Sequence, residues 1–237
     1  MAILKHGDAD KLAHQSKHYY HLVMLSVLFA VICIPTAGKT VDLFGVPLSI
    51  SIFYFPVAYI AADLMTEVYG YALARRAIWY SVAAQLMTMV AFQIIAWAPS
   101  SVTMQAADNQ AFAHVLSQAP LFVVVGLTAI FVGDIVNNFI LAKMKVASKG
   151  KNMAMRFVAS TIGGELVNTF IFYFFALVLT GIIPMNYAMG SILLASLAKT
   201  AVEIVLLPVT IRVAKKLKKI EGIDFYDNKT NFNPMKF

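Results

Sequence analysis

The sequence predicts an all-α, polytopic membrane protein with six transmembrane helices. Of its 237 residues, 60% are hydrophobic and only 13% are charged, and the mean hydropathy is +0.74. A soluble domain carries roughly a quarter charged residues, so this chain has too few polar side chains to cover a surface in water. The composition excludes an ordinary water-soluble enzyme, a disordered chain and a secreted protein held by disulfides.

Six apolar stretches have about the 20 residues that cross a bilayer core as a helix. They run over residues 20–37, 50–69, 77–98, 121–142, 157–181 and 189–213. We expect a single membrane domain, 1–237, in which the six-span bundle 20–213 lies between cytoplasmic tails at 1–19 and 214–237. The second stretch is the least apolar because it contains Asp63, Thr66 and Glu67, and Pro56 interrupts it. Such a segment is compatible with a broken or re-entrant helix.

The basic residues alternate between the segments that connect these stretches. Seventeen of the 19 lysines and arginines lie in the N-terminal tail, in 70–76, in 143–156 or after residue 211. Lys39 is the one basic residue in a segment on the opposite side, and Lys199 lies inside a span. The positive-inside rule predicts that the basic side is cytoplasmic, so both termini are expected there. Topology and attraction to anionic lipid account for the net charge of +7, and no nucleic-acid partner is expected.

A short internal similarity connects two of the spans. Residues 62–67 resemble residues 164–169, and each segment lies in the middle span of a group of three. Two halves of three spans have opposite orientations in the membrane, as in inverted-repeat transporters. The similarity is therefore a hint of an inverted 3+3 repeat.

Ionisable side chains inside the spans mark the candidate site. A charge at mid-membrane costs about 2.5–3.5 kcal/mol on insertion scales. Five acids accompany a single lysine, Lys199, and the acids are Asp63, Glu67, Asp134, Glu165 and Glu203. This excess of acids favours a polar cavity over a set of structural ion pairs. Lys199 and Glu203 are four residues apart, however, so a purely structural pair on one helix face is an equal alternative for them.

A stripe of residues spaced by four lies on one face of the second span. Its members are Phe55, Tyr59, Asp63 and Glu67, with Thr66 beside them. Aromatic rings can stack on a flat heterocycle while carboxylates accept hydrogen bonds from its N–H edge. The alternative is an aromatic face packed on neighbouring helices, with Glu67 near the end of the span and paired with Arg75 or Arg76.

The fifth span carries a similar stripe. It comprises Thr161, Glu165, Asn168 and Phe172, next to Gly163 and Gly164, which allow another helix to approach closely. The fourth span adds Asp134, Asn137 and Asn138. We assign substrate binding to Phe55, Tyr59, Asp63, Thr66, Glu67, Glu165, Asn168, Phe172 and Lys199. Proton coupling or structural pairing is assigned to Asp134, Asn137 and Glu203.

The sequence contains no recognisable catalytic or metal-binding motif. Cys33 is the only cysteine, and the five histidines lack the spacing of zinc ligands. A phosphate-binding loop with its lysine and a GxSxG turn are also missing. We therefore expect no enzymatic activity, no cofactor and no metal. Without an ATP-binding domain in this chain, transport would use an ion gradient, a partner protein or the substrate gradient itself.

Several motifs in register along the chain carry a family resemblance. They are Phe55-Pro56, Tyr59, Asp63, Thr66-Glu67-Val68-Tyr69-Gly70, Ala74-Arg75-Arg76, Lys143-Met144-Lys145, Arg156, Ser160-Thr161, Lys199, Pro208 and the ending from Glu221-Gly222 to Asn233-Pro234. The chain resembles the queuosine-precursor transporter family, also called the VUT family. The resemblance covers nearly the whole chain, and its DxxTEVYGxxxARR run is highly specific.

The resemblance implies uptake of 7-deazapurines across the cell inner membrane. The implied substrates are 7-cyano-7-deazaguanine and 7-aminomethyl-7-deazaguanine, precursors of the modified tRNA base queuosine. It also implies that Asp63, Asn168 and Lys199 form the polar centre. The family often has an aspartate where Asn168 stands here, while Glu165 supplies an acid one turn earlier, so either residue of this span can carry the family's polar role.

We expect Asp63, with Glu165, to read the base edge, because one carboxylate can accept both the ring N–H and the exocyclic amine. Lys199 would balance the charge while two three-span halves alternate access. The alternatives are a substrate-binding subunit of an ATP-driven vitamin-type importer, an integral-membrane enzyme without a recognisable motif, and a structural membrane protein. The expected partners are the deazapurine base and the lipid bilayer. The sequence leaves open the preferred precursor, the energy coupling, the role of loop 99–120 and whether a homo-oligomer forms.

Overall fold

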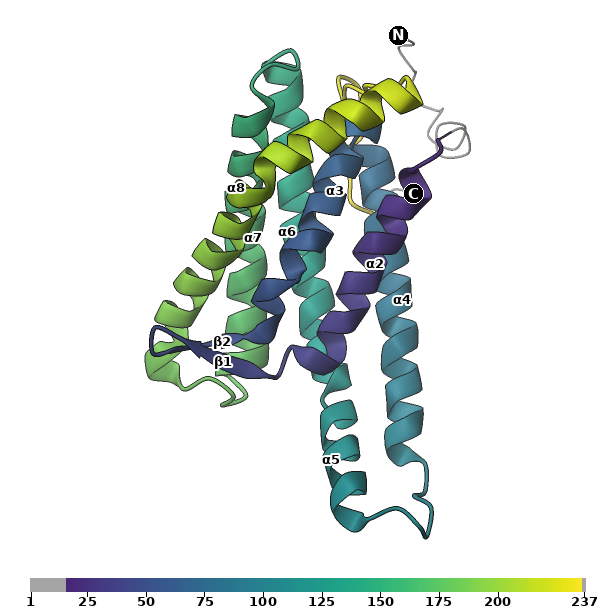
Figure 1. Ribbon diagram of the computed structural model, residues 1–237, viewed down its shortest axis with the longest axis vertical. Coiled ribbons are helices and arrows are strands. Elements are labelled where there is room, and N and C mark those ends of the chain that lie inside the picture. Colours follow the sequence, from purple (N-terminus) through teal and green to yellow (C-terminus); the bar gives the residue numbers. More distant parts are fainter. Residues whose placement is uncertain (1–15, 236–237) are drawn as a thin grey trace.

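A computed structural model describes residues 16–235, so most of the predicted tail 1–19 lies outside the described residues. The chain is 76% helical and forms an elongated bundle (Figure 1). In chain order the elements are α2 (Tyr19–Thr36), β1 (Thr40–Leu43), β2 (Val46–Ser49), η1 (Ile50–Phe53), α3 (Phe55–Tyr69), α4 (Tyr71–Trp97), α5 (Ala106–Ser117), α6 (Ala119–Ala147), α7 (Met153–Phe172), η2 (Tyr173–Val178), η3 (Met185–Tyr187) and α8 (Ala188–Glu221).

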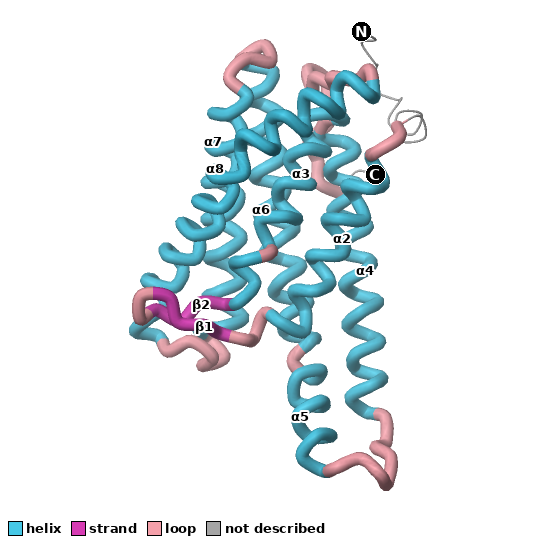
Figure 2. The backbone as a smooth tube through the Cα atoms, viewed as in Figure 1, coloured by secondary structure: helices cyan, strands magenta, loops and turns pink. Residues whose placement is uncertain are grey.

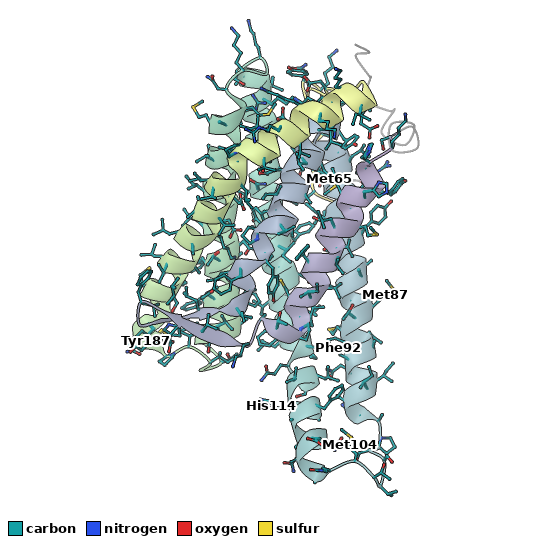
Figure 3. All side chains as sticks on the ribbon, viewed as in Figure 1. Met65, Met87, Phe92, Met104, His114 and Tyr187 are labelled. Carbon is teal, nitrogen blue, oxygen red and sulfur yellow. The ribbon has the colours of Figure 1, made fainter. Side chains whose placement is uncertain are left out.

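Five helices among residues 16–235 are long and apolar enough to cross a membrane. They are Tyr19–Thr36, Tyr71–Trp97, Ala106–Ala147, Met153–Val178 and Met185–Glu221. Their apolar side chains face outward as lipid-facing side chains do, for example Met87, which is 68% exposed and points away from α4 in Figure 3. The chain is a multi-pass, mostly helical membrane protein.

The predicted span 50–69 is the exception, because it is divided at Tyr54 into the 3-10 helix η1 and the α-helix α3. With 15 residues, α3 is about 22 Å long, shorter than a bilayer core of about 30 Å. The break agrees with the interrupted helix that Pro56 suggested, and a sixth complete span stays a prediction. Nearly all of α3 is buried against α2, α4, α6 and α8. Protein neighbours rather than lipid therefore surround its polar side chains.

The segment predicted as loop 38–49 forms a short β-hairpin within the otherwise helical fold. β1 and β2 pair antiparallel, with Leu43 opposite Val46 (Figure 2). Phe44 and Gly45 between them have φ of 53° and 76°, as a tight hairpin turn of the primed type requires. The backbone N–H of Ser49 donates to Tyr173 Oη at 2.9 Å, which attaches the hairpin to η2.

Two further segments differ from the predicted boundaries. Loop 99–120 contains α5, which projects with the end of α4 beyond the rest of the bundle (Figure 1). His114 lies on α5 and is exposed, in agreement with a solvated side chain. α8 continues through Glu221, beyond the predicted end at 213.

The two ends of the bundle differ in character. At the basic end α2, α4 and α7 begin and α3, α6 and α8 end, which gathers the basic segments 70–76, 143–156 and 212–219 (Figure 1). The hairpin end carries β1 and β2 together with the connections on either side of α5. We use these two names below.

Candidate functional site

A central cavity of about 440 Å³ lies among the helices. Its polar wall residues are Ser51, Gln85, Asn168 and Lys199, and its aromatic wall residues are Phe55, Phe122 and Phe172. Small-molecule sites combine apolar walls with a few polar groups. The cavity therefore has the composition of a site for a small, flat, partly polar molecule.

The cavity occupies the half of the bundle nearer the hairpin end. Its wall includes Cys33 and Ile34 from the last turn of α2, Phe55 from the first turn of α3, and Phe122 from the first turn of α6. All three turns are close to the hairpin end. Phe172 lies where α7 passes into the π-helical turn η2, a rare irregularity that is often found at functional sites.

Lys199 is the one cationic side chain in the cavity wall. Its Nζ lies 3.1 Å from Glu165 Oε2, 3.2 Å from Thr169 Oγ1 and 4.4 Å above the centroid of the Phe55 ring. Both members of the ion pair are nearly inaccessible to solvent, with side-chain exposures of 5% and 0%. Removal of one partner from such a pair would leave an uncompensated buried charge. The Lys199–Glu203 pair that we weighed as an alternative does not form, because Lys199 turns to Glu165 on the neighbouring helix.

Asp63 and Glu203 line a second cavity, of about 280 Å³, between α3, α7 and α8. Asn137 Nδ2 donates to Asp63 Oδ1 at 2.6 Å, and Thr161 Oγ1 donates to Glu203 Oε2 at 2.6 Å. Glu203 Oε1 is buried without a hydrogen-bond partner. Within the described part of the chain, neither carboxylate has a lysine, arginine or histidine within ion-pair distance.

Tyr59 and Asp134 line a third cavity, of about 400 Å³, which is bounded by α2, α3, α4 and α6. Phe55 belongs to the walls of both this cavity and the central one, and its ring centroid lies 5.4 Å from that of Tyr59. The two rings of the predicted aromatic stripe on α3 thus share the third cavity, and only Phe55 also reaches the central cavity. Tyr59 does not line the central cavity.

Glu67 and Thr66 lie toward the basic end, away from all three cavities. Glu67 Oε1 accepts from Arg156 Nη2 of α7 at 2.8 Å and from Lys218 Nζ of α8 at 2.5 Å, and it lies 3.8 Å from Lys145 Nζ of α6. Arg75, one of the two partners that we considered for Glu67, instead donates to backbone carbonyls near the C-terminus. Thr66 Oγ1 donates to Asn138 Oδ1 at 2.8 Å, a contact between α3 and α6.

The close packing of α6 on α7 aligns their polar residues. A Cβ atom on Gly164 would overlap Asn137 and the carbonyl of Gly133, and one on Gly133 would overlap Asn168. The close helix approach expected at Gly163 and Gly164 is confirmed. This packing places Asn137 against α3 and keeps Asn168 at the edge of the central cavity.

The predicted site residues are therefore divided between the central cavity and other parts of the bundle. Phe55, Asn168, Phe172 and Lys199 share the central cavity, and Glu165 touches it through its pair with Lys199. The sequence reasoning did not assign the wall residues Cys33, Ser51, Gln85 and Phe122 to the site. Of these only Gln85 carried a signal, as an amide within a span, and the sequence favoured a hydrogen bond between helices for it. Among residues 16–235 no three His, Cys, Asp or Glu side chains come together in a way that could hold a metal ion.

Comparison with known proteins finds a matching family and a curated relative. Residues 49–213, about 70% of the chain, match the family described as "Putative vitamin uptake transporter". A curated relative, the "Probable queuosine precursor transporter" of Bacillus subtilis (strain 168), is 24% identical over 196 residues, which cover 81% of this chain and 83% of the relative. No solved structure matches the chain.

Proposed function

The chain belongs to the putative vitamin uptake transporter family, and we propose that it imports the deazaguanine bases 7-cyano-7-deazaguanine and 7-aminomethyl-7-deazaguanine across the bacterial inner membrane. The observation that carries the proposal is the central cavity, which Lys199 and three aromatic rings line inside a membrane protein. The name of the B. subtilis relative supports the choice of substrate class.

A deazaguanine base offers a flat bicyclic ring, one carbonyl oxygen and a hydrogen-bond-donating edge. We assign stacking to Phe55 and Phe172, which contribute rings to the cavity wall from α3 and α7. Lys199 Nζ and the amide of Asn168 are the donors for the carbonyl oxygen. The amide oxygen of Gln85 is the acceptor in the same wall for the N–H edge. These assignments give the carbonyl oxygen and the N–H edge of the base partners within the cavity.

The geometry changes the role that we assign to Asp63. The sequence pattern predicted that this carboxylate reads the base edge, but it lines the second cavity together with Glu203. We propose instead that Asp63 and Glu203 carry the coupling proton. Two carboxylates in a dry site without a cation in contact are costly to keep ionised together, and a proton is the smallest charge that can neutralise them. Glu67, Glu165, Asp134 and Lys199 are the other charged groups nearest to this pair.

For the transport cycle we propose alternating access between two three-helix halves. The inverted repeat predicted from residues 62–67 and 164–169 places Asp63 on one half and Glu165 on the other. Both acids lie near the junction of α6 with α3 and α7, because Asp63 accepts from Asn137 of α6 and α7, which carries Glu165, packs on α6. A rocking motion at this junction would expose the cavity to each side in turn.

Binding by the purified protein tests the substrate assignment. We expect 7-cyano-7-deazaguanine to raise the melting temperature of the detergent-solubilised protein in proportion to its concentration, whereas adenine, whose edge differs, has no effect. Asn168→Ala should abolish the shift and the matched change Asn228→Ala, at an exposed position outside the cavity, should preserve it. Equal shifts with adenine and the deazaguanine would refute the assignment.

A further inference from the structure

The C-terminal segment 222–235, which we call the strap, lies across the basic end on α3, α4 and α6. The carboxylate of Asp227 accepts from the backbone N–H of Tyr71 at 3.2 Å. Tyr71 Oη in turn donates to the carbonyl of Phe232 at 3.1 Å, and Arg75 Nη1 donates to the carbonyls of Asn231 and Asn233, each at 2.8 Å. The first turns of α4 thus hold the strap through several hydrogen bonds.

Two glycines make room for the strap. Gly70, with φ of 88°, separates α3 from α4, and a Cβ atom there would overlap the ring of Phe225. Gly150, with φ of 78°, lies between α6 and α7, and a Cβ atom there would overlap the hydroxyl of Tyr226. Both connections between helices at this end are therefore shaped to fit aromatic side chains of the strap.

Beneath the strap, an ion cluster joins four helices. Glu67 of α3 pairs with Arg156 of α7 and Lys218 of α8, and Lys145 Nζ of α6 donates to the Glu67 carbonyl at 2.5 Å. Glu67, Lys145 and Arg156 have at most 1% of their side-chain surface exposed. Such a desolvated, mutually bonded network holds one arrangement firmly because partial rupture leaves buried charges unpaired.

Asp224 connects the strap to this cluster. Its Oδ1 lies 2.7 Å from Lys145 Nζ and 2.8 Å from Lys218 Nζ. Burial alone would raise the pKa of Asp224, but the hydrogen bonds from the two lysines outweigh it and hold the pKa below its ordinary value. The strap therefore engages the cluster as an ionised carboxylate.

We propose that the strap and the ion cluster form the gate at the basic end, and that both must release for the central cavity to open to that side. The proposal rests on the proposed transport function. The cavity lies in the hairpin half, whereas the cluster and the strap tie α3, α4, α6, α7 and α8 together at the opposite end. A substrate that leaves the central cavity through the basic end has to pass the ion cluster and the strap.

Two separate parts of the sequence supply the residues of the gate. The run from Glu67 through Gly70 to Arg75 supplies the cluster acid, the glycine under the strap and the strap's guanidinium partner. The ending from Asp224 through Asp227 to Asn233 supplies their complements. These residues lie outside the central cavity, so the geometry assigns them to movement of the protein rather than to recognition of the base.

Labelling of Cys33, the only cysteine of the chain, reports access to the central cavity because this residue lines it. We compare sealed vesicles of both orientations, treated with a membrane-impermeant methanethiosulfonate. The gate is weakened with Tyr71→Phe plus Arg75→Gln, which removes three hydrogen bonds to the strap. Lys216→Gln, an exposed change of equal charge on α8, is the matched control. Tyr71→Phe alone is the milder variant if the double variant does not fold.

The double variant should accelerate modification of Cys33 from the basic side by about tenfold, since loss of charge-assisted hydrogen bonds favours the open state by roughly that factor. The wild type and the control should stay slow from that side. If Cys33 in the folded double variant is modified from the basic side at the wild-type rate, whether that rate is slow or fast, the gate proposal is wrong. The readout needs no substrate, so the gate and the substrate assignment can fail separately.

Discussion

Lys199 and Glu165 form a buried ion pair, 3.1 Å from Nζ to Oε2, at the wall of the central cavity. The same ammonium group lies over the ring of Phe55, so α3, α7 and α8 meet at one cation. The pair holds Lys199 at the cavity wall. Under the proposed function it connects the stability of the bundle with the recognition of a polar base.

Replacement of one member of this pair separates these two roles. Lys199→Met leaves Glu165 buried and unpaired and should lower the free energy of unfolding by about 3–5 kcal/mol. Lys199→Met combined with Glu165→Met removes both charges and should recover most of that loss. Neither variant should bind the deazaguanine, which thermal melts with and without ligand can establish. Full binding by the double variant would show that the ammonium group is dispensable.

Asp63→Asn tests the role of the second cavity. The amide is nearly the same size and keeps a partner in Asn137, so the protein should fold and remain in the membrane. The amide of this variant cannot bind and release a proton, so uptake of the base should be lost. Uptake measured beside immunodetection of the membrane fraction distinguishes the two effects, and normal uptake would refute any transport role for this carboxylate.

Glu203→Gln addresses coupling rather than transport as such. If Glu203 carries a proton with Asp63, the variant should retain exchange of labelled for unlabelled base but lose the stimulation of net uptake by an inward proton gradient. Asp108→Asn, at an exposed position on α5, is the matched control. A variant that still responds fully to the gradient would exclude Glu203 from the coupling site.

The strap should respond to acid. The pKa of Asp224 is lower in the folded protein than in the unfolded chain, so its contribution to stability is complete above the unfolded value and is lost as pH falls through the folded value. The melting temperature of the wild type should therefore exceed that of Asp224→Asn at neutral pH, and the difference should vanish as pH falls below the range in which an ordinary aspartate titrates. Asp108→Asn on the exposed surface of α5 is the control, and a difference independent of pH would contradict the ionised strap.

The α6–α7 contact makes a prediction about packing. A Cβ atom on Gly164 overlaps Asn137 and backbone of α6, so Gly164→Ala should force the helices apart and cost about 1–3 kcal/mol. Gly190→Ala, where a Cβ atom meets nothing closer than 3.8 Å, should be nearly neutral. Thermal melts of the two variants compare the sites directly, and equal melting temperatures would show that the contact tolerates a methyl group.

Much of the fold follows from the sequence because bilayer thickness sets the length of an apolar helix. The alternation of basic segments likewise anticipated which ends of the helices lie together. The acids Asp63, Glu165 and Glu203 are buried in the bundle, as charges inside apolar stretches should be. These features depend on local composition, which a single sequence records.

The interaction partners of these residues could not be predicted from local composition. Spacing by four places Glu67 on the face of Asp63, yet its partners Arg156 and Lys218 come from helices far along the chain. Periodicity identifies a helix face but not the neighbour that covers it. For the same reason Lys199 could not be assigned to Glu165 rather than to Glu203. The hairpin 40–49 was missed because its own strand pairing is supplemented by contacts with Tyr173 and Ser191, which lie far along the chain.

Uptake of labelled 7-cyano-7-deazaguanine by proteoliposomes that contain only this protein tests the central claim most directly. The vesicles are compared with and without an inward proton gradient, alongside Lys199→Met and the exposed control Lys216→Gln. The account predicts uptake by the wild type and the control, stimulation by the gradient and no uptake by Lys199→Met. Wild-type vesicles that bind the base but do not accumulate it, or that need an added ATP-driven partner to do so, would contradict it.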